Sequence, residues 1–395
     1  MKPFIRLLLA FLVILLSAAP TVAQEALWDE LNSKVIMLYQ QGQYSEAAKV
    51  AEEALKVAEK TFGPDHPNIA TSLNNLALLY DAQGKYAEAE PLYKRSLAIE
   101  ERALGPNHPD VATSLNNLAE LYKAQGKYAE AEPLLKRSLA IREKSLGPDH
   151  PHVAISLNNL VGLYRAQGKY VEAEPFQKRA LAIWEKALGP SHPNIATSLN
   201  NLAELYRAQG KYAEAEPLYK RALVIEETIR PNHPDVARPL NNLAVLYQAQ
   251  GKYAEAEPLL KRSLVIREKS LGPNHPDVAQ SLNNLAELYK AQGKYAEAEP
   301  FLKRSLAIRE KSLGPNHPNV AISLNNLAGL YMAQSKYAEA ESLYKRSLAI
   351  WEEALGPDHP NVATICENMA ECYRKLGKEK EAEESEARAR KIRLK

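Results

Sequence analysis

The sequence has 395 residues, of which 46% are apolar and 25% are charged, so the chain has enough apolar residues to fold around a core. With 17 glycines and 2 cysteines it is neither a collagen-like chain nor a disulfide-rich scaffold. Lys and Arg number 50 against 48 Asp and Glu, and the two signs alternate along the chain, so nucleic acid is not expected as a partner.

The amino terminus has the pattern of a secretory signal peptide. Lys2 and Arg6 precede an apolar stretch at residues 7–19, and small residues follow up to Ala23. We expect residues 1–23 to be cleaved as a signal peptide, which places the mature chain in the periplasm or outside the cell. The apolar stretch is shorter than the ~20 residues that span a bilayer, so no membrane span is expected after cleavage. Retention of the segment as an uncleaved anchor is the alternative.

A segment with the pattern Gly-Pro-x-His-Pro recurs through most of the chain. Successive complete copies lie 42 residues apart, except across a degraded copy at residues 230–234. Self-similarity at a fixed period of this length predicts an array of stacked structural units. The complete copies begin at Gly63, Gly105, Gly147, Gly189, Gly272, Gly314 and Gly356.

Each unit contains two runs in which apolar residues fall at helical spacing. Leu73, Leu76 and Ala77 represent the first run, and Tyr86 opens the second. Gly84 lies between them, and a glycine there ends the first helix because it adopts a positive φ without strain. Each unit is therefore predicted to be a pair of antiparallel helices.

The Gly-Pro-x-His-Pro segment connects one pair to the next. Its final proline suits the first position of a helix, where the missing N–H would have had no partner. The residue before a proline avoids the α region, so His66 and its equivalents are expected just outside the helix, as caps. Histidines one repeat apart should be ~10 Å or more from each other, too far to share a metal ion. We therefore expect no metal and no cofactor, although His150 and His152 form one His-x-His pair.

These positions resemble the tetratricopeptide repeat. The 42-residue spacing, the sequence Asn-Asn-Leu-Ala and the sequence Gly-Lys-Tyr-x-Glu-Ala-Glu-Pro are similar, more narrowly, to the repeats of kinesin light chain. The resemblance covers about residues 25–393 and implies an all-α, right-handed superhelical solenoid, here with about nine antiparallel helix pairs. The small and aromatic positions that match are Leu76, Ala77, Tyr80, Gly84, Tyr86, Ala89, Tyr93 and Ser96.

The two ends of the array depart from the pattern. Residues 24–62 lack the double asparagine, and residues 359–395 end in a run of Glu, Lys and Arg. Terminal repeats must cover the core with a polar face, so we expect an atypical first repeat and a capping last repeat. Seven 42-residue repeats occupy residues 63–358 between them.

One internal junction is also irregular. Only 41 residues separate His192 from His233, Arg230 replaces the glycine, and Pro239 enters a first helix beyond its expected opening turn. A proline inside a helix removes a backbone hydrogen bond and bends the helix. We therefore expect a kink and a change of superhelical phase near residues 226–240.

The two cysteines are not expected to pair within the chain. Cys366 and Cys372 lie six residues apart on one predicted helix, about 9 Å at ~1.5 Å per residue, and a disulfide needs less than about 7 Å between Cα atoms. They stand where other repeats have leucine, so we interpret them as small core residues. An intermolecular bridge is the alternative.

Two tryptophans share one position of the repeat. Trp184 and Trp351 stand where other repeats carry Arg142, Glu226, Arg267 or Arg309. A position that tolerates charge is expected to be exposed, so each tryptophan is predicted on the outer face as a point of contact for a partner.

The first helices carry the candidate binding residues. The resemblance implies that first helices line the concave surface, where one asparagine of each double asparagine would project from the wall. An amide donates and accepts hydrogen bonds at once, so a row of amides at ~10 Å steps is suited to an extended peptide backbone. The row consists of Asn74, Asn116, Asn158, Asn200, Asn241, Asn283 and Asn325.

Cations stand seven residues further along several of these helices. Lys123, Arg165, Arg207 and Lys290 flank the asparagine row and would favour acidic residues in the peptide. The alternative is that the asparagines only bond neighbouring helices and that the cations form surface pairs with glutamates at spacing i, i+3.

These features predict an exported scaffold that binds extended, acidic peptide segments of a protein partner. The rival hypothesis is a structural or spacer element of the cell envelope that associates with itself and has no peptide ligand. An enzyme is not expected, because no phosphate-binding loop, nucleophile elbow or zinc-protease motif occurs. Recurrent carboxylates such as Glu88 and Glu90 suit solvated helix faces better than one tuned acid–base pair.

Overall fold

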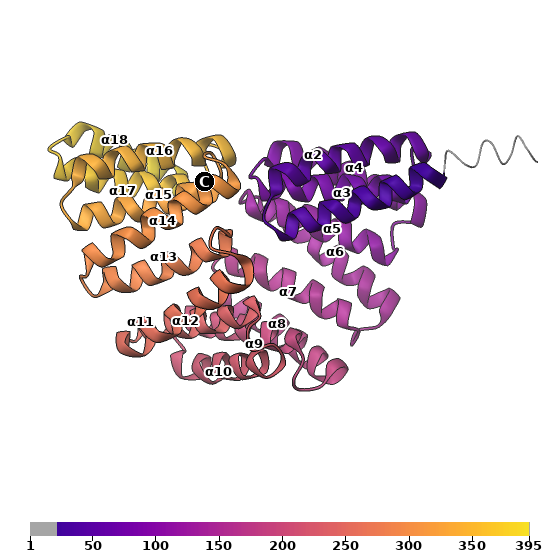
Figure 1. The fold of residues 1–395 in the computed structure, drawn as a ribbon, viewed down its shortest axis with the longest axis horizontal. Coiled ribbons are helices and arrows are strands. Elements are labelled where there is room, and N and C mark those ends of the chain that lie inside the picture. Colours follow the sequence, from indigo (N-terminus) through magenta and orange to yellow (C-terminus); the bar gives the residue numbers. More distant parts are fainter. Residues whose placement is uncertain (1–21, 395) are drawn as a thin grey trace, which may run out of the picture. The chain divides into compact units, whose positions relative to one another are not determined.

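The computed structural model describes residues 22–394. Within this range the regular elements are all helical, and they follow one another as consecutive pairs (Figure 1). The chain divides into two compact units, residues 1–117 and residues 118–395, and the boundary falls within α5 (Pro109–Ala124).

Unit 1 contains two complete helix pairs and the start of a third. A helix over residues 22–40 precedes the first labelled element, so Val22 and Ala23 are helical. The rest of the predicted signal peptide lies outside the described residues. The elements that follow are α2 (Tyr44–Thr61), α3 (Pro67–Ala82), α4 (Tyr86–Leu104) and the beginning of α5.

Unit 2 continues the same alternation to the end of the chain. Most first helices have 16 residues and most second helices have 19. In chain order the elements after α5 are α6 (Tyr128–Leu146), α7 (Pro151–Ala166), α8 (Tyr170–Leu188), α9 (Pro193–Ala208), α10 (Tyr212–Ile229), the 3-10 turn η1 (Pro234–Val236), α11 (Ala237–Ala249), α12 (Tyr253–Leu271), α13 (Pro276–Ala291), α14 (Tyr295–Leu313), α15 (Pro318–Ala333), α16 (Tyr337–Leu355), α17 (Pro360–Lys375) and α18 (Glu379–Arg393).

The helices of residues 22–394 make nine pairs, so the predicted all-α solenoid of about nine helix pairs is confirmed. In unit 2 each first helix packs against its own second helix, as α7 does with α8, and each second helix packs against the next first helix, as α8 does with α9. None of the described helices combines the length and the apolar character needed to cross a bilayer.

Small residues set the close packing within a pair. In α3 and α4, Leu73, Leu76, Ala77 and Ala89 are buried, as their helical spacing predicts. The alanines have no side-chain atoms beyond Cβ, so the two helix backbones approach each other closely at these positions. In unit 2 buried clusters extend from one pair to the next, as Ala244, Leu282 and Leu327 belong to one cluster. The side chains left over define the surfaces.

The junctions have the predicted capping geometry. His66 has extended backbone angles of φ −76° and ψ 136°, and its Nδ1 accepts a hydrogen bond of 3.1 Å from the backbone N–H of Asn68. Pro67 is the first residue of α3, where its missing N–H removes no bond. The same cap forms at His108, His150, His192, His233, His275, His317 and His359.

The prediction that Trp184 and Trp351 are exposed is wrong. Their exposed fractions are 4% and 6%, because this position of the second helix packs beneath the first helix of the next pair. A charge at the same position is also buried. Arg142 donates to the hydroxyl of Ser156 at 3.1 Å and to the carbonyl of His152 at 3.2 Å. A charged side chain there finds partners inside the junction, so tolerance of charge did not indicate exposure.

The cysteines are core residues, as predicted. Cys366 and Cys372 are both free and buried in the last pair. Burial raises the pKa of each thiol above its usual range, so both remain in the neutral form at physiological pH.

The irregular junction is built differently from the sequence prediction. Its first helix opens as the short 3-10 turn η1, and the α-helix α11 begins only at Ala237. Pro239 is therefore the third residue of α11 and lies in its first turn, where its missing N–H would have had no intrahelical partner. The expected kink inside the helix is replaced by a later start of the α-helix. The change of superhelical phase stays a prediction.

Arg230 and Glu226 form an ion pair at this junction. The Glu226 side chain is 4% exposed, and Pro239 stands where other repeats offer a serine hydroxyl to this position. Arg230, which replaces the glycine of the regular junctions, donates to Glu226 at 3.1 Å and to Asp235 at 2.9 Å. The two departures from the repeat therefore form one ion-paired cluster.

Changing Arg230→Gly restores the glycine of the regular repeat but leaves the Glu226 carboxylate buried without its cation. We expect the free energy of unfolding to fall by about 1–3 kcal/mol, less than for a fully buried pair because Arg230 is 32% exposed. Urea unfolding measures the loss. The double variant Glu226→Gln, Arg230→Gly should recover most of it, and a single variant as stable as the wild type would contradict the pairing.

Candidate functional site: the first-helix face

The first helices of unit 2 form one continuous surface. First helices two elements apart contact each other directly, as α9 does with α11, α11 with α13 and α15 with α17. We name the solvent-facing side of α7, α9, α11, α13, α15 and α17 the first-helix face. It carries the predicted binding residues of unit 2 together with the end of α5.

The structure buries much of the predicted asparagine row. Asn116, Asn200, Asn241 and Asn283 have exposed fractions of 5%, 1%, 4% and 8%. Asn74, Asn158 and Asn325 are half-buried. Four of the seven amides therefore lie between helices and only three reach the surface in part. Peptide binding by the row stays a prediction.

At some positions the row makes hydrogen bonds from one first helix to the next, whereas the buried Oδ1 atoms of Asn116, Asn158 and Asn241 have no hydrogen-bond partner within residues 22–394. Asn283 Oδ1 accepts from Asn326 Nδ2 at 2.7 Å, and Asn325 Oδ1 accepts from Asn368 Nδ2 at 2.8 Å. Asn74 donates to the Ser114 hydroxyl at 3.1 Å in unit 1. These bonds fit the alternative that the sequence left open, in which the amides join neighbouring helices.

The second asparagine of each pair was not among the predicted site residues. Asn326 and Asn368 are the donors in the bonds above. Asn159, Asn201 and Asn242 are likewise half-buried. The bonds of Asn326 and Asn368 fit the alternative in which the second asparagines, rotated by 100° from the first, bond neighbouring helices.

The four predicted cations all reach the first-helix face, and three pair with carboxylates. Lys123 pairs with Glu120, Arg165 pairs with Glu204, and Lys290 lies 2.8 Å from Glu287. Burial lowers the pKa of Arg165 below its usual range. Such partly exposed pairs contribute little to stability, so a ligand carboxylate can compete for the cations.

Two cavities open on this face. One of about 410 Å³ is lined by Lys123, Gly162, Arg165, Tyr170, Glu204 and Arg207, with two alanines. The other, of about 420 Å³, is centred on Gly329 and lies at the equivalent place four repeats later. Both fall within the size range of small-ligand sites, which begins near 300 Å³.

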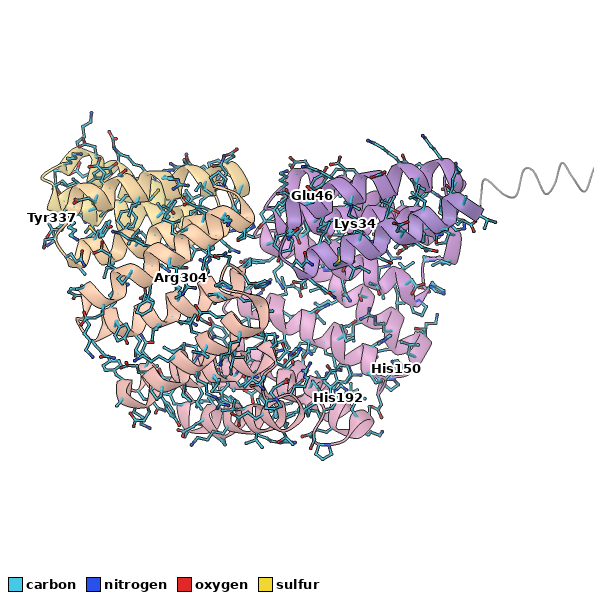
Figure 2. The ribbon with its side chains drawn as sticks, viewed as in Figure 1. Lys34, Glu46, His150, His192, Arg304 and Tyr337 are labelled. Carbon is cyan, nitrogen blue, oxygen red and sulfur yellow. The ribbon has the colours of Figure 1, made fainter. Side chains whose placement is uncertain are left out.

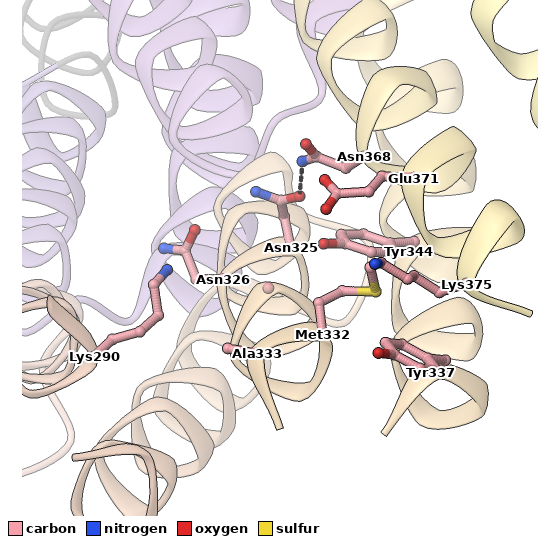
Figure 3. Close-up of a pocket in the computed structure, with 11 residues that line it drawn as sticks. Lys290, Asn325, Asn326, Met332, Ala333, Tyr337, Tyr344, Asn368, Glu371 and Lys375 are labelled. Atoms are coloured by element: carbon pink, nitrogen blue, oxygen red, sulfur yellow. Dashed lines mark hydrogen bonds between the residues drawn. The ribbon is translucent and has the colours of Figure 1, made fainter. Parts of the chain in front are cut away.

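Figure 3 shows the second cavity. Lys290 reaches toward Asn326 from a neighbouring helix, and the Asn325–Asn368 bond forms one wall. Met332, Tyr337 and the other labelled side chains surround the space. Tyr337, Tyr344 and Lys375 were missed at the level of the sequence. The tyrosines lie on the second helix α16 and Lys375 is the last residue of α17, and the asparagine periodicity of the first helices marks neither place.

The junction histidines do not form a metal site among the described residues. His150 and His192 each cap a first helix at separate junctions (Figure 2). Residues 22–394 contain no group of three or more His, Cys, Asp or Glu placed to hold a metal ion. Burial lowers the pKa of His359, which favours the neutral ring whose Nδ1 accepts the capping bond.

Recurrent glutamates of the second helices have structural partners. Glu299 accepts from the Tyr331 hydroxyl at 3.3 Å and pairs with Lys303 at 2.8 Å. The Lys303 ammonium is the largest cause that lowers the pKa of Glu299, to about 2. The carboxylate is therefore ionised at neutral pH and is poorly suited to act as a general acid. The equivalent tyrosine–glutamate bonds join Tyr164 to Glu132, Tyr247 to Glu216 and Tyr289 to Glu257.

Comparison with protein families gives one repeated match. The model for the tetratricopeptide repeat matches most of the chain in overlapping segments, which confirms the resemblance found in the sequence. No curated protein matches the sequence. The matched residues are 31–102, 82–144, 110–170, 152–228, 235–311, 282–331 and 319–395.

Solved structures with similar repeats include a putative kinesin light chain with nearly identical TPR-like repeats from Podosopora anserina. It is 33% identical, and the match covers 52% of this chain and 97% of that chain at a TM-score of 0.42. BtubC (BKLC) from P. vanneervenii is 25% identical over 59% of this chain and 92% of its own, at a TM-score of 0.45.

Longer matches occur at lower identity. A Rap protein complexed with competence and sporulation factor is 15% identical, with 94% of this chain and 98% of that chain covered at a TM-score of 0.59. Aspartyl phosphate phosphatase F from Bacillus subtilis is 13% identical, with 93% and 94% covered at a TM-score of 0.52. At this identity the likeness shows the fold alone.

Proposed function

The chain belongs to the tetratricopeptide repeat family, and we propose that its first-helix face binds an extended, acidic peptide segment of a protein partner. The repeats form a protein-interaction scaffold. The observation that supports a peptide ligand most directly is the pair of cavities on this face, each lined by cations that belong to two or three different first helices.

The ligand contacts are divided between charges and amides. Lys123, Arg165, Arg207 and Lys290 attract carboxylates of the peptide to the first-helix face. Asn158 and Asn325 are half-buried and offer amide groups to the peptide backbone in unit 2, and Asn74 is the equivalent residue of unit 1. The buried Asn283, which accepts from Asn326 of the next first helix, helps to fix the spacing of α13 and α15.

The affinity of such a site is expected to be moderate. Each neutral hydrogen bond contributes about 0.5–1.5 kcal/mol net, and ordering the peptide costs part of this gain. Several contacts together correspond to a dissociation constant on the order of micromolar. Exposed ion pairs add a contribution to the binding free energy that weakens as the salt concentration is raised.

We also propose that the scaffold acts outside the cytoplasm, in the periplasm or after secretion. The support is the sequence pattern of the amino terminus, where Lys2 and Arg6 precede an apolar stretch and small residues lead to Ala23. Cleavage after Ala23 removes only two residues from the helix over residues 22–40, so the first helix pair stays intact.

Removing two cations from the first-helix face tests the binding function. Peptides are selected from a random phage-display library on the immobilised chain and then measured by calorimetry. We expect acidic peptides to be enriched and to bind about tenfold more weakly to the variant Lys123→Ala, Arg207→Ala, because two attractive charges are lost. Helicity should be unchanged.

The matched control removes two cations from second helices. Lys178 and Lys220 are more than half exposed and pair with glutamates of their own helices, so Lys178→Ala, Lys220→Ala should leave the affinity unchanged. Equal loss in both variants would contradict binding at the first-helix face. Exclusive recovery of the chain itself from its native compartment would favour a self-associating spacer instead.

Processing of the amino terminus tests the proposed location. The full chain is expressed in a Gram-negative host, and the periplasmic fraction is examined by mass spectrometry. We expect a species that begins at Gln24, and Ala23→Tyr should block its formation because signal peptidase needs a small residue there. Ala26→Tyr lies beyond the cut and should have no effect. A chain that keeps Met1 and stays in the cytoplasm would contradict export.

A further inference from the structure

Two first helices lack a side chain at a position where four others carry glutamate. Gly162 in α7 and Gly329 in α15 occupy the position that is Glu120, Glu204, Glu287 or Glu371 elsewhere. Neither glycine has a positive φ, so the backbone does not require glycine at these positions. A glycine inside a helix costs about 0.5–1 kcal/mol relative to alanine. The local effect of each glycine is to open space on the first-helix face.

A lysine of the preceding first helix lies over each opening. A Cβ atom built on Gly162 would be 3.3 Å from Lys123 Nζ, and one built on Gly329 would be 3.9 Å from Lys290 Nζ. Both spaces are continuous with the cavities of about 410 and 420 Å³. An ammonium group therefore borders each space that a glutamate side chain would otherwise fill.

The opening at Gly162 has an excess of positive charge. Its lining contains Lys123, Arg165 and Arg207, against the single carboxylate of Glu204. Counting Glu120, which pairs with Lys123 from outside the lining, still leaves three cations against two carboxylates. Desolvation of the Arg165 guanidinium adds to the benefit of one more anion at this place.

The opening at Gly329 has nearly the same volume as the opening at Gly162 but a different balance of charges. Met332 stands where Arg165 stands in the first opening, and the cations are Lys290 and Lys375. Glu371 in the lining and Glu287, which pairs with Lys290, balance them. The second opening therefore has no excess charge.

We propose that the opening at Gly162 is a subsite for one carboxylate side chain, aspartate or glutamate, of a bound extended peptide. The peptide supplies the carboxylate that four other repeats carry in their own sequence, and it lies among Lys123, Arg165 and Arg207. This subsite rests on the peptide-binding function proposed above and adds to it the position at which acidic side chains are selected.

The probe for this subsite is fluorescein-labelled hexaglutamate, with hexaglutamine as the neutral comparison, measured by fluorescence anisotropy on the full chain. We expect Gly162→Glu to weaken hexaglutamate binding about tenfold, because the new carboxylate fills the space and neutralises the excess cation. Gly162→Gln fills the same space without charge and should give a smaller loss. Val224→Glu adds the same charge at an exposed position of the second helix α10 and should change the affinity less than about threefold.

Failure to fold is not expected in these variants. Glutamate is the residue of the equivalent position in other repeats and has a higher helix propensity than glycine, so the unfolding midpoint of Gly162→Glu should equal or exceed that of the wild type. Unchanged hexaglutamate binding in Gly162→Glu would overturn the subsite, and so would an equal loss in Val224→Glu.

The subsite and the wider function fail in different ways. Binding of hexaglutamine as tight as that of hexaglutamate, with both weakened by changes on the first-helix face, would overturn the subsite and leave the scaffold function standing. Peptide binding that no change on the first-helix face affects would overturn both.

Discussion

Hydrogen bonds between the asparagines of successive first helices are the contacts on which the rest of this account depends. The amide–amide bonds Asn326 to Asn283 and Asn368 to Asn325, at 2.7 and 2.8 Å, join helices that belong to different repeats. Leaving a buried amide without its partner costs about 1–3 kcal/mol, so these two bonds favour one spacing of α13, α15 and α17. That spacing holds Lys290 and Lys375, which belong to different repeats, around the cavity at Gly329.

Near-identity of the repeats makes their exceptions informative. At the irregular junction Arg230 supplies a cation to the buried Glu226, and Pro239 takes the place of the serine that other repeats offer there. On the first-helix face Gly162 removes a glutamate and leaves the cations around it in excess. The first exception is balanced within the chain. The second is not, and an external carboxylate is the partner that its charge fits.

The sequence predicted the repeat, the helix pairs and the histidine caps, because each follows from local rules on proline, glycine and helical spacing. It did not predict how deeply the asparagine row is buried. A helical wheel places Asn200 on a side of α9, but its 1% exposure depends on how closely the neighbouring first helix packs. Trp184 was misplaced for the same reason, since the junction above it covers a position that alternates between aromatic and charged residues. The local sequence pattern predicted contacts within a repeat, but it could not predict the contacts between repeats.

A double-mutant cycle on Asn283 and Asn326, with hydrogen exchange measured in α13 and α15, tests the structural role of the row most directly. The account predicts that Asn283→Ala and Asn326→Ala each reduce protection of both helices and that the double variant adds little to either, because the two amides share one bond. Asn284→Ala, which removes only an acceptor for Gln280 of its own helix, should leave protection unchanged. Full protection in Asn283→Ala and Asn326→Ala, together with loss of peptide binding, would contradict this structural role. That result would indicate that the asparagines of the row bind the ligand instead.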